Sequence, residues 1–243
     1  MNLQTCKNIV RMLRTHGLRR TLRSLVQRAS ERYHDWRLGI DTSHVIQPAE
    51  AGVGCADANE YVPTDYCSFR RVMSDLDIHD DDVFLDLGSG MGRALVMAAW
   101  YPFRRVLGVE YSPGLNRAAE ANIRRALPAA RRTAVSTAVA DASRYDVPDD
   151  VTVVYFFNSF RGETFASALC KIRESLDRTP RRLRLICNVP FLSTNIEERV
   201  RACGWMKKVV EFPFPPTTRY FIYESRVPPS SASGDGQLVS GSS

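Results

Sequence analysis

The sequence predicts an α/β fold: a doubly wound, mostly parallel sheet that ends in an antiparallel C-terminal hairpin and carries a helical N-terminal extension. From Val83 onward, short β-favouring runs alternate with helical runs, as in βαβ units around a parallel sheet. After residue 204, WMKKVVEF (205–212) and TTRYFIYES (217–225) alternate apolar and polar residues across a short proline loop, as antiparallel strands do. We expect strands at 83–87, 105–109, 133–139, 151–157 and 182–188, and helices at 64–76, 91–100, 113–126, 161–176 and 194–203.

Three segments of different composition divide the 243 residues. We expect residues 1–60 to form a basic helical extension that caps the domain, residues 61–226 to form the globular ligand-binding domain, and residues 227–243 to form a disordered tail. The tail, VPPSSASGDGQLVSGSS, has too few apolar residues to build a core.

The extension accounts for the whole net positive charge of the chain. Residues 1–38 contain nine Lys/Arg against Glu31 and Asp35, which gives +7, while the full chain has a net charge of +6. Apolar residues recur at helical spacing over 3–38 and predict one or two amphipathic helices broken near Gly17. Such a helix suits anionic lipid or nucleic acid, but its basic residues form no compact cluster. We therefore favour packing of the apolar stripe against the domain.

Composition excludes several classes of protein. No apolar run reaches the roughly 18 residues of a membrane span, and the N-terminus lacks the apolar core of a secretory signal. The six cysteines form no CxxC pair and the four histidines no ligand pattern, so neither a metal nor a disulfide framework is expected. We expect a cytoplasmic protein with reduced thiols, and with Cys170 and Cys187 in the core.

The stretch VFLDLGSGMGRAL, Val83 to Leu95, predicts a ligand held against bare backbone. Glycine permits positive φ and close approach, and a loop after the first parallel strand lies at the ligand-binding edge of the sheet. A dinucleotide fingerprint spaces its glycines GxGxxG, whereas this loop reads GxGxG. Asp86 inside the strand end suits a cationic ligand portion better than a diphosphate, and the ammonium and sulfonium of S-adenosylmethionine are such portions.

Two further acids end the next strands. Glu110 follows VLGV, 22 residues beyond Gly88, where it is placed to accept ribose hydroxyls of either S-adenosylmethionine or NAD. Asp141 ends the third strand, where a carboxylate suits an adenine amino group, although it is also a candidate helix N-cap. With the terminal hairpin, the ordered set favours a methyl donor over a nicotinamide.

VFLDLGSGMGRAL, VLGVEYSP, VADAS and VVYFFNSF, in this order, resemble the motifs of class I S-adenosylmethionine-dependent methyltransferases. The resemblance spans roughly residues 61–225 and implies a Rossmann-like sheet of seven strands. DLGSGMGR with GVE and YVPT further resembles a subset that includes lysine methyltransferases, and RLGIDTS resembles bacterial methyltransferase-like proteins. The implied cofactor is S-adenosyl-L-methionine, and its implied binding residues are Thr64, Asp86, Leu87, Gly88, Ser89, Gly90, Gly92, Glu110, Tyr111, Asp141, Ala142 and Asn158.

The resemblance also implies an acceptor site beyond the strand that ends in Asn158-Ser159-Phe160. Amino-group methyltransferases carry an Asn/Asp-Pro-Pro-aromatic motif there, and this chain lacks both prolines. We expect Asn158, Ser159, Phe160 and Tyr61 as catalytic residues, with Tyr61 or Tyr66 as candidates to help deprotonate an amine. Three structural interpretations stay open. Asn158 is an ordinary turn residue, Phe160 is a core residue, or Pro63 begins a helix with Thr64 in its first turn.

An amine, including a protein lysine, or a small molecule is the expected acceptor. The alternatives are a nucleic-acid methyltransferase that uses the basic arm and a non-catalytic methyltransferase-like binding module. No base is assignable for an oxygen acceptor, and the oligomeric state is open.

Overall fold

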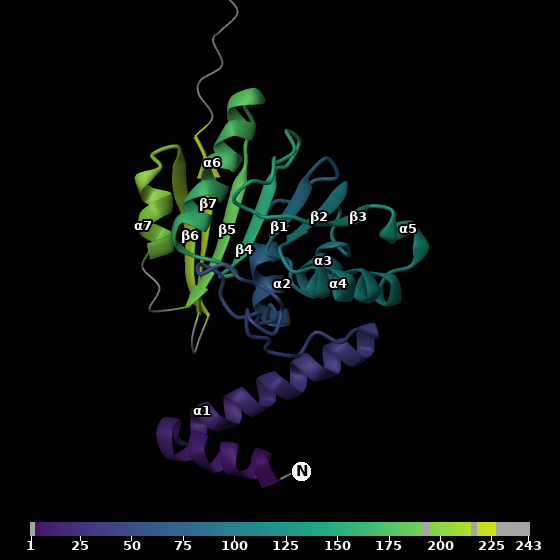
Figure 1. The fold of residues 1–243 in the computed structure, drawn as a ribbon, viewed down its shortest axis with the longest axis vertical. Coiled ribbons are helices and arrows are strands. Elements are labelled where there is room, and N and C mark those ends of the chain that lie inside the picture. The colour runs from purple at the N-terminus through teal and green to yellow at the C-terminus, as the bar shows by residue number, and fades with distance from the viewer. Residues whose placement is uncertain (1–2, 191–194, 215–217, 227–243) are drawn as a thin grey trace, which may run out of the picture.

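The fold is built on one sheet of seven strands (Figure 1). The computed structural model describes residues 3–190, 195–214 and 218–226, so the predicted tail at 227–243 lies outside the described residues. The strand order is β3-β2-β1-β4-β5-β7-β6, and β7 runs antiparallel to both of its neighbours. The strands are β1 (Val83–Leu87), β2 (Arg105–Glu110), β3 (Val135–Val139), β4 (Val153–Phe157), β5 (Arg184–Pro190), β6 (Met206–Phe214) and β7 (Thr218–Ser225). The predicted Rossmann-like sheet with its terminal hairpin is confirmed.

Helices cover both faces of this sheet and make two cores. Side chains of α6 and α7 fill one core, and side chains of α2, α3 and α4 fill the other. The helices are α1 (Leu3–Leu38), α2 (Tyr66–Ser74), α3 (Arg93–Ala98), α4 (Pro113–Ala126), α5 (Ala129–Arg132), α6 (Gly162–Arg178) and α7 (Asn195–Ala202). The short α5 was not predicted. Cys187 is buried as expected, whereas Cys170 is exposed on α6, so that prediction is wrong. No helix among the described residues has the length and apolarity to cross a membrane.

The central strand explains why the sequence run before the glycines is so apolar. All five residues of β1 are buried because helices cover both faces of the sheet there. Asp86 differs from the other residues of β1, because it places a carboxyl group in a strand whose other side chains are aliphatic or aromatic. A buried carboxyl without a partner is costly, which indicates that this position serves a ligand.

The N-terminal arm is helical, as predicted, and breaks at Gly17, whose φ of 75° and ψ of 166° interrupt α1. The expectation that its apolar stripe packs on the domain is wrong for the three stripe residues that follow. Leu18, Leu22 and Val26 are exposed, with 64%, 51% and 68% of their surface accessible. The inward face of α1 is polar instead, and Glu31 and Asp35 lie on it.

Arg93, the first residue of α3, joins α1 to the sheet. It is 2% exposed, and its guanidinium forms ion pairs with both Glu31 and Asp35. Its Nη1 donates to the Thr64 carbonyl at 3.0 Å and its Nε to Thr42 Oγ1 at 2.6 Å. The guanidinium also lies 4.7 Å from the centre of the Tyr66 ring. This set, which we call the Arg93 cluster, fastens α1, the segment after it and the start of α2 to the glycine loop.

We expect Arg93→Met to destabilise the protein by about 3–5 kcal/mol, because it leaves two buried carboxyl groups without their cation. Arg104→Met is the matched control: Arg104 also pairs with an aspartate, Asp150, but it is 51% exposed, so the expected cost is about 0–1 kcal/mol. Urea unfolding measures both variants. Equal midpoints for the two would show that the cluster does not hold the arm.

Candidate functional site

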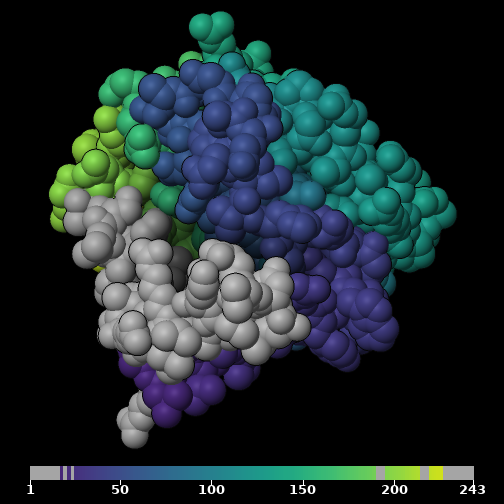
Figure 2. All heavy atoms as spheres, turned by 60° about the horizontal axis from the view of Figure 1, so that its bottom comes forward, coloured from purple at the N-terminus to yellow at the C-terminus, as the bar shows by residue number. Residues whose placement is uncertain are grey.

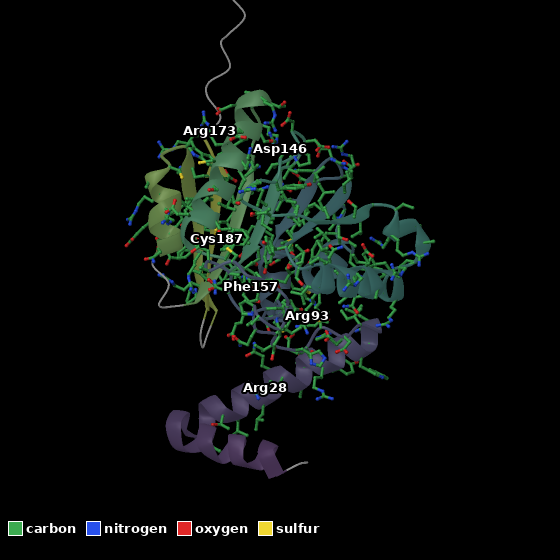
Figure 3. The ribbon with its side chains drawn as sticks, viewed as in Figure 1. Arg28, Arg93, Asp146, Phe157, Arg173 and Cys187 are labelled. Atoms are coloured by element: carbon green, nitrogen blue, oxygen red, sulfur yellow. The ribbon has the colours of Figure 1, made fainter. Side chains whose placement is uncertain are left out.

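A cavity opens at the carboxyl edge of the parallel strands. The empty space within it, including solvent at its open mouth, is about 970 Å³. Residues 46–61, which we call the strap, cross this edge and line the cavity opposite the glycine loop. Figure 2 looks toward this side of the molecule and shows the blue surface of residues 39–60 between the green and teal parts of the domain. Figure 3 shows Phe157 and Arg93 at this edge and Asp146 at the opposite one.

The glycine loop lines one wall, and its three glycines serve different contacts. Gly88 and Gly90 have φ of 84° and 54°. A Cβ on Gly88 would lie 2.3 Å from Ser159 Cβ, and one on Gly90 would lie 2.2 Å from the Tyr61 ring. Gly92 does not line the cavity; a Cβ there would lie 2.8 Å from Ala119 Cβ, so this glycine lets α3 and α4 pack together. Leu87 does not line the cavity either.

Asp86 contributes a carboxyl group to the cavity wall and is 3% exposed. No hydrogen-bond partner for it is found among the described residues. Burial, and then the nearby Glu110, raise the pKa of Asp86 well above its usual range. Beside it, the buried Ser89 Oγ also lacks a partner within the described part of the chain. The Asp86 carboxyl in this wall fits a ligand that brings a positive charge.

Glu110 lies across the loop with both carboxylate oxygens partly engaged. One oxygen accepts from the Gly90 amide at 2.8 Å and the other from the Ser112 amide at 2.8 Å. Burial raises the pKa of Glu110, and these backbone hydrogen bonds oppose the increase. The carboxylate retains acceptor capacity beyond these bonds, which fits a ligand that carries hydroxyl groups.

Asp141 lines the far end of the cavity with Ala142 and Tyr111. Its Oδ1 accepts from the Ser143 amide at 2.9 Å and from Ser143 Oγ at 2.7 Å. Residues 142–144 form a turn, so Asp141 caps a turn, and the N-cap of a helix is excluded. Its Oδ2 makes no hydrogen bond with the described residues and is available to a donor such as an exocyclic amine.

Tyr61 and Thr64 meet the glycine loop from the strap side. The Tyr61 hydroxyl donates to the Thr42 carbonyl at 3.2 Å, and burial raises the pKa of Tyr61. Thr64 precedes Asp65, the N-cap of α2, so the alternative that places it in the first helical turn is wrong. The Tyr66 hydroxyl donates to Asp35 at 2.7 Å inside the Arg93 cluster and does not reach the cavity, which removes it as a candidate base.

Solved structures of low sequence identity share this fold. An RNA methyltransferase from Salinibacter ruber, in complex with S-adenosyl-L-homocysteine, is 21% identical, with a TM-score of 0.50 over 69% of this chain and 95% of that one. The glycopeptide N-methyltransferase MtfA, complexed with (S)-adenosyl-L-methionine, is 12% identical, with a TM-score of 0.54 over 65% and 92%. A precorrin-6y C5,15-methyltransferase from Geobacter metallireducens is 19% identical, with a TM-score of 0.51 over 67% and 88%.

The family comparison concerns the part of the chain that carries the glycine loop. Residues 58–132 match the family model described as "Histone methylation protein DOT1", and no curated protein matches the chain by sequence. The matched segment runs from the end of the strap past α4 and includes Asp86 and Glu110. The chain is a class I S-adenosylmethionine-dependent methyltransferase. Its cofactor is S-adenosyl-L-methionine, as the sequence motifs predicted.

The acceptor side of this methyltransferase is built where β4 ends. Ser159 and Phe160 line the cavity, whereas Asn158 does not. Asn158 has a φ of 46°, the only left-handed backbone among the described residues other than glycine. Asn59 of the strap donates from its amide to the Ser159 carbonyl at 3.0 Å and from its Nδ2 to the Asn158 carbonyl at 2.8 Å. Each carbonyl that would orient an amine therefore already has one of its acceptor positions filled by the strap.

Sequence reasoning missed two residues of this methyltransferase that the structure brings forward. Arg93 stands in the apolar run RALVMAA, and a single charge in a helix expected to be buried is a signal that a buried ion pair awaits it. Asn59 gives no such signal, because it lies in a loop whose path is set by contacts distant in sequence.

We expect the affinity for S-adenosylmethionine to rise with pH, and to rise less in Asp86→Asn. The raised pKa of Asp86 means that part of the free protein is protonated there, whereas a cationic ligand favours the carboxylate, so binding releases a proton. Titration calorimetry between about pH 5 and 8, in buffers of different ionisation enthalpy, counts that proton. Asn has nearly the same shape as Asp, so Asp86→Asn tests the effect of the charge alone. Asp150→Asn makes the same change on the surface and is the control. If Asp86→Asn releases as many protons on binding as the wild type does, Asp86 does not contribute to proton release. Any protons that the variant still releases are expected to come from Glu110.

Proposed function

We propose that this methyltransferase transfers the methyl group of S-adenosylmethionine to an amine, with a protein lysine as the first acceptor class to test. The observation that carries the cofactor part of the proposal is the buried Asp86 carboxyl, unpartnered among the described residues, beside the glycine loop and Glu110. In this proposal Asp86 meets the cationic methionine portion, Glu110 accepts both ribose hydroxyls, and Asp141 Oδ2 accepts from the adenine amino group. Tyr61 and Thr64 lie over the methionine end.

The division of the chain follows from the same roles. Residues 61–226 form the methyltransferase domain, and residues 1–60 form a cap whose strap closes one wall of the cavity. Supporting this, the strap is fastened at both ends of the cavity: Ser112 Oγ donates to the Ala51 carbonyl at 2.5 Å, and the Arg161 amide donates to the Asp57 carbonyl at 2.9 Å.

The chemistry is an in-line displacement on an activated sulfonium, so the protein contributes alignment and exclusion of water. Alignment of this kind supplies roughly 7–11 kcal/mol of barrier reduction. Ser159 and Phe160 follow β4 and line the cavity. The Phe160 ring packs in the core against Phe156 and Phe165, as the alternative interpretation expected, and its cavity-lining part would attract the positive charge that develops on an amine. The Tyr61 phenol keeps its proton, because burial raises its pKa. The amine therefore enters in its neutral form, with water as the proton acceptor.

The amine class rests on two supports. Ser159 and Phe160 follow β4 at the position of the amino-group motif, and the family model that matches residues 58–132 is described as a histone methylation protein. The fold alone does not choose an acceptor, since the neighbours named above include an RNA and a glycopeptide methyltransferase. Nucleic acid is the second candidate, favoured by the charge of +7 on residues 1–38.

Glu110→Ala should weaken binding of S-adenosylhomocysteine by roughly 100-fold, because two charge-assisted hydrogen bonds to the ribose are lost. Because Glu110 also holds the Gly90 amide, a 2′-deoxy analogue separates the two effects. Wild-type protein should bind the analogue more weakly than the parent compound, and Glu110→Ala should bind both alike. Equal affinity of the wild type for both compounds would refute the ribose assignment.

Asn158→Ala and Asn158→Gly together test the acceptor side. Radiolabelled donor is first offered to lysine-containing peptides, small amines and RNA, and we expect labelled peptide or amine. If the Asn158 side chain acts on the acceptor, both variants lose turnover by about tenfold or more and keep cofactor affinity. If Asn158 serves only its left-handed backbone, Asn158→Gly retains turnover, because glycine adopts that φ without strain. Label on RNA alone would overturn the amine proposal.

A further inference from the structure

Between residues 18 and 36, one face of α1 presents large apolar side chains to solvent. Trp36, Val26, Leu18, Tyr33 and Leu22 are 77%, 68%, 64%, 54% and 51% exposed. Successive members are separated by four, four, seven and three residues, so all five lie on one side of a helix with 3.6 residues per turn. We call this set the outer stripe. It extends about 27 Å, at 1.5 Å per residue.

The outer stripe points away from the domain. Glu31 and Asp35, on the opposite side of the helix, are the residues that pair with Arg93, and Gln27 donates to Asp65 at 3.1 Å. Figure 1 shows α1 outside the sheet and its covering helices, on the side of the carboxyl edge. The outer stripe therefore does not contribute to the hydrophobic core, and an exposed apolar patch of this kind marks an interaction surface.

Charge decides what the outer stripe meets. Residues 1–38 contain two acids, and both are turned inward to Arg93. Arg28, Arg32 and Arg37 are exposed, and Figure 3 labels Arg28 on α1, beneath the domain. The outward charge of the arm is accordingly positive. A second copy of α1 would bring like charge to the same face, whereas an anionic surface complements it.

The side chains of the outer stripe favour lipid over nucleic acid as the surface that it binds. Leu18, Leu22 and Val26 form a continuous aliphatic run that offers nothing to a phosphate or a base edge, whereas acyl chains receive it. Tyr33 and Trp36 follow at the end nearest the domain, and these amphipathic rings favour the boundary between headgroups and acyl chains.

We propose that α1 binds the surface of a membrane that contains anionic phospholipid. The helix lies in the plane of the surface, with the outer stripe at the boundary of headgroups and acyl chains and its arginines on lipid phosphates. This places the carboxyl edge of the sheet, and with it the cavity, on the membrane side of the molecule. The inference does not rest on the acceptor class proposed above.

Sedimentation with vesicles tests the proposal on the full chain without cofactor. We expect binding to phosphatidylcholine vesicles that contain roughly a third phosphatidylglycerol, at least tenfold weaker binding to pure phosphatidylcholine, and a decrease with added salt. Leu22→Glu with Val26→Glu should reduce binding by at least tenfold. Val209→Glu, a partly exposed valine on β6, is the matched control and should bind as the wild type does.

Fluorescence identifies the inserted segment. The chain has three tryptophans, and a blue shift on vesicle addition should disappear in Trp36→Phe and persist in Trp100→Phe. Equal binding to neutral and anionic vesicles, or full binding by the double glutamate variant, would overturn the proposal. So would a dimer that the same variant dissociates, or tight binding of RNA that the glutamates abolish while vesicles go unbound.

Discussion

The buried guanidinium of Arg93 is the interaction on which the rest of the structure depends. An isolated charge in the interior costs several kcal/mol, and Arg93 is stabilised because two carboxyl groups, a carbonyl, two hydroxyls and an aromatic face surround it. These partners come from four different parts of the chain: α1, the segment after it, the residues before α2, and α2 itself. One side chain at the start of α3 thus fixes the extension relative to the glycine loop.

The two acids beside Arg93 differ in environment. Burial alone would raise the pKa of Asp35, but Arg93 and hydrogen bonds from Ser43, Tyr66 and the Thr42 amide outweigh it and lower the pKa. Glu31 receives less such support: burial and its hydrogen bond with Asp65 raise its pKa to about 8. Asp35 is therefore the permanent counter-ion of Arg93, and Glu31 is the partner whose charge depends on its surroundings.

The features that could be predicted from the sequence are those that depend on local patterns of residues. The bounds of β1 and α4 follow from continuous burial and helical periodicity, and the glycine loop with Glu110 follows from chemistry at strand ends. Which face of α1 turns toward the domain could not be predicted, because the sequence contains both an apolar face and an acidic face. Which face turns inward was decided by Arg93, and in the absence of that partner an apolar stripe is expected to pack inward.

The strap and the Arg93 cluster are held by different kinds of interaction. Hydrogen bonds such as those of Asn59 and Ser112 hold the strap to the segments that follow β4 and β2, and each contributes about 0.5–1.5 kcal/mol net. Separation of the Arg93 cluster would expose an ion pair network at a cost of about 3–5 kcal/mol. The strap is thus held by several small contributions, whereas one buried ionic cluster holds α1. Because Asn59 reaches the Asn158 and Ser159 carbonyls, the strap also contacts the acceptor side. The strap therefore borders both the cavity and the end of β4, and the extension that carries it is held in place by Arg93.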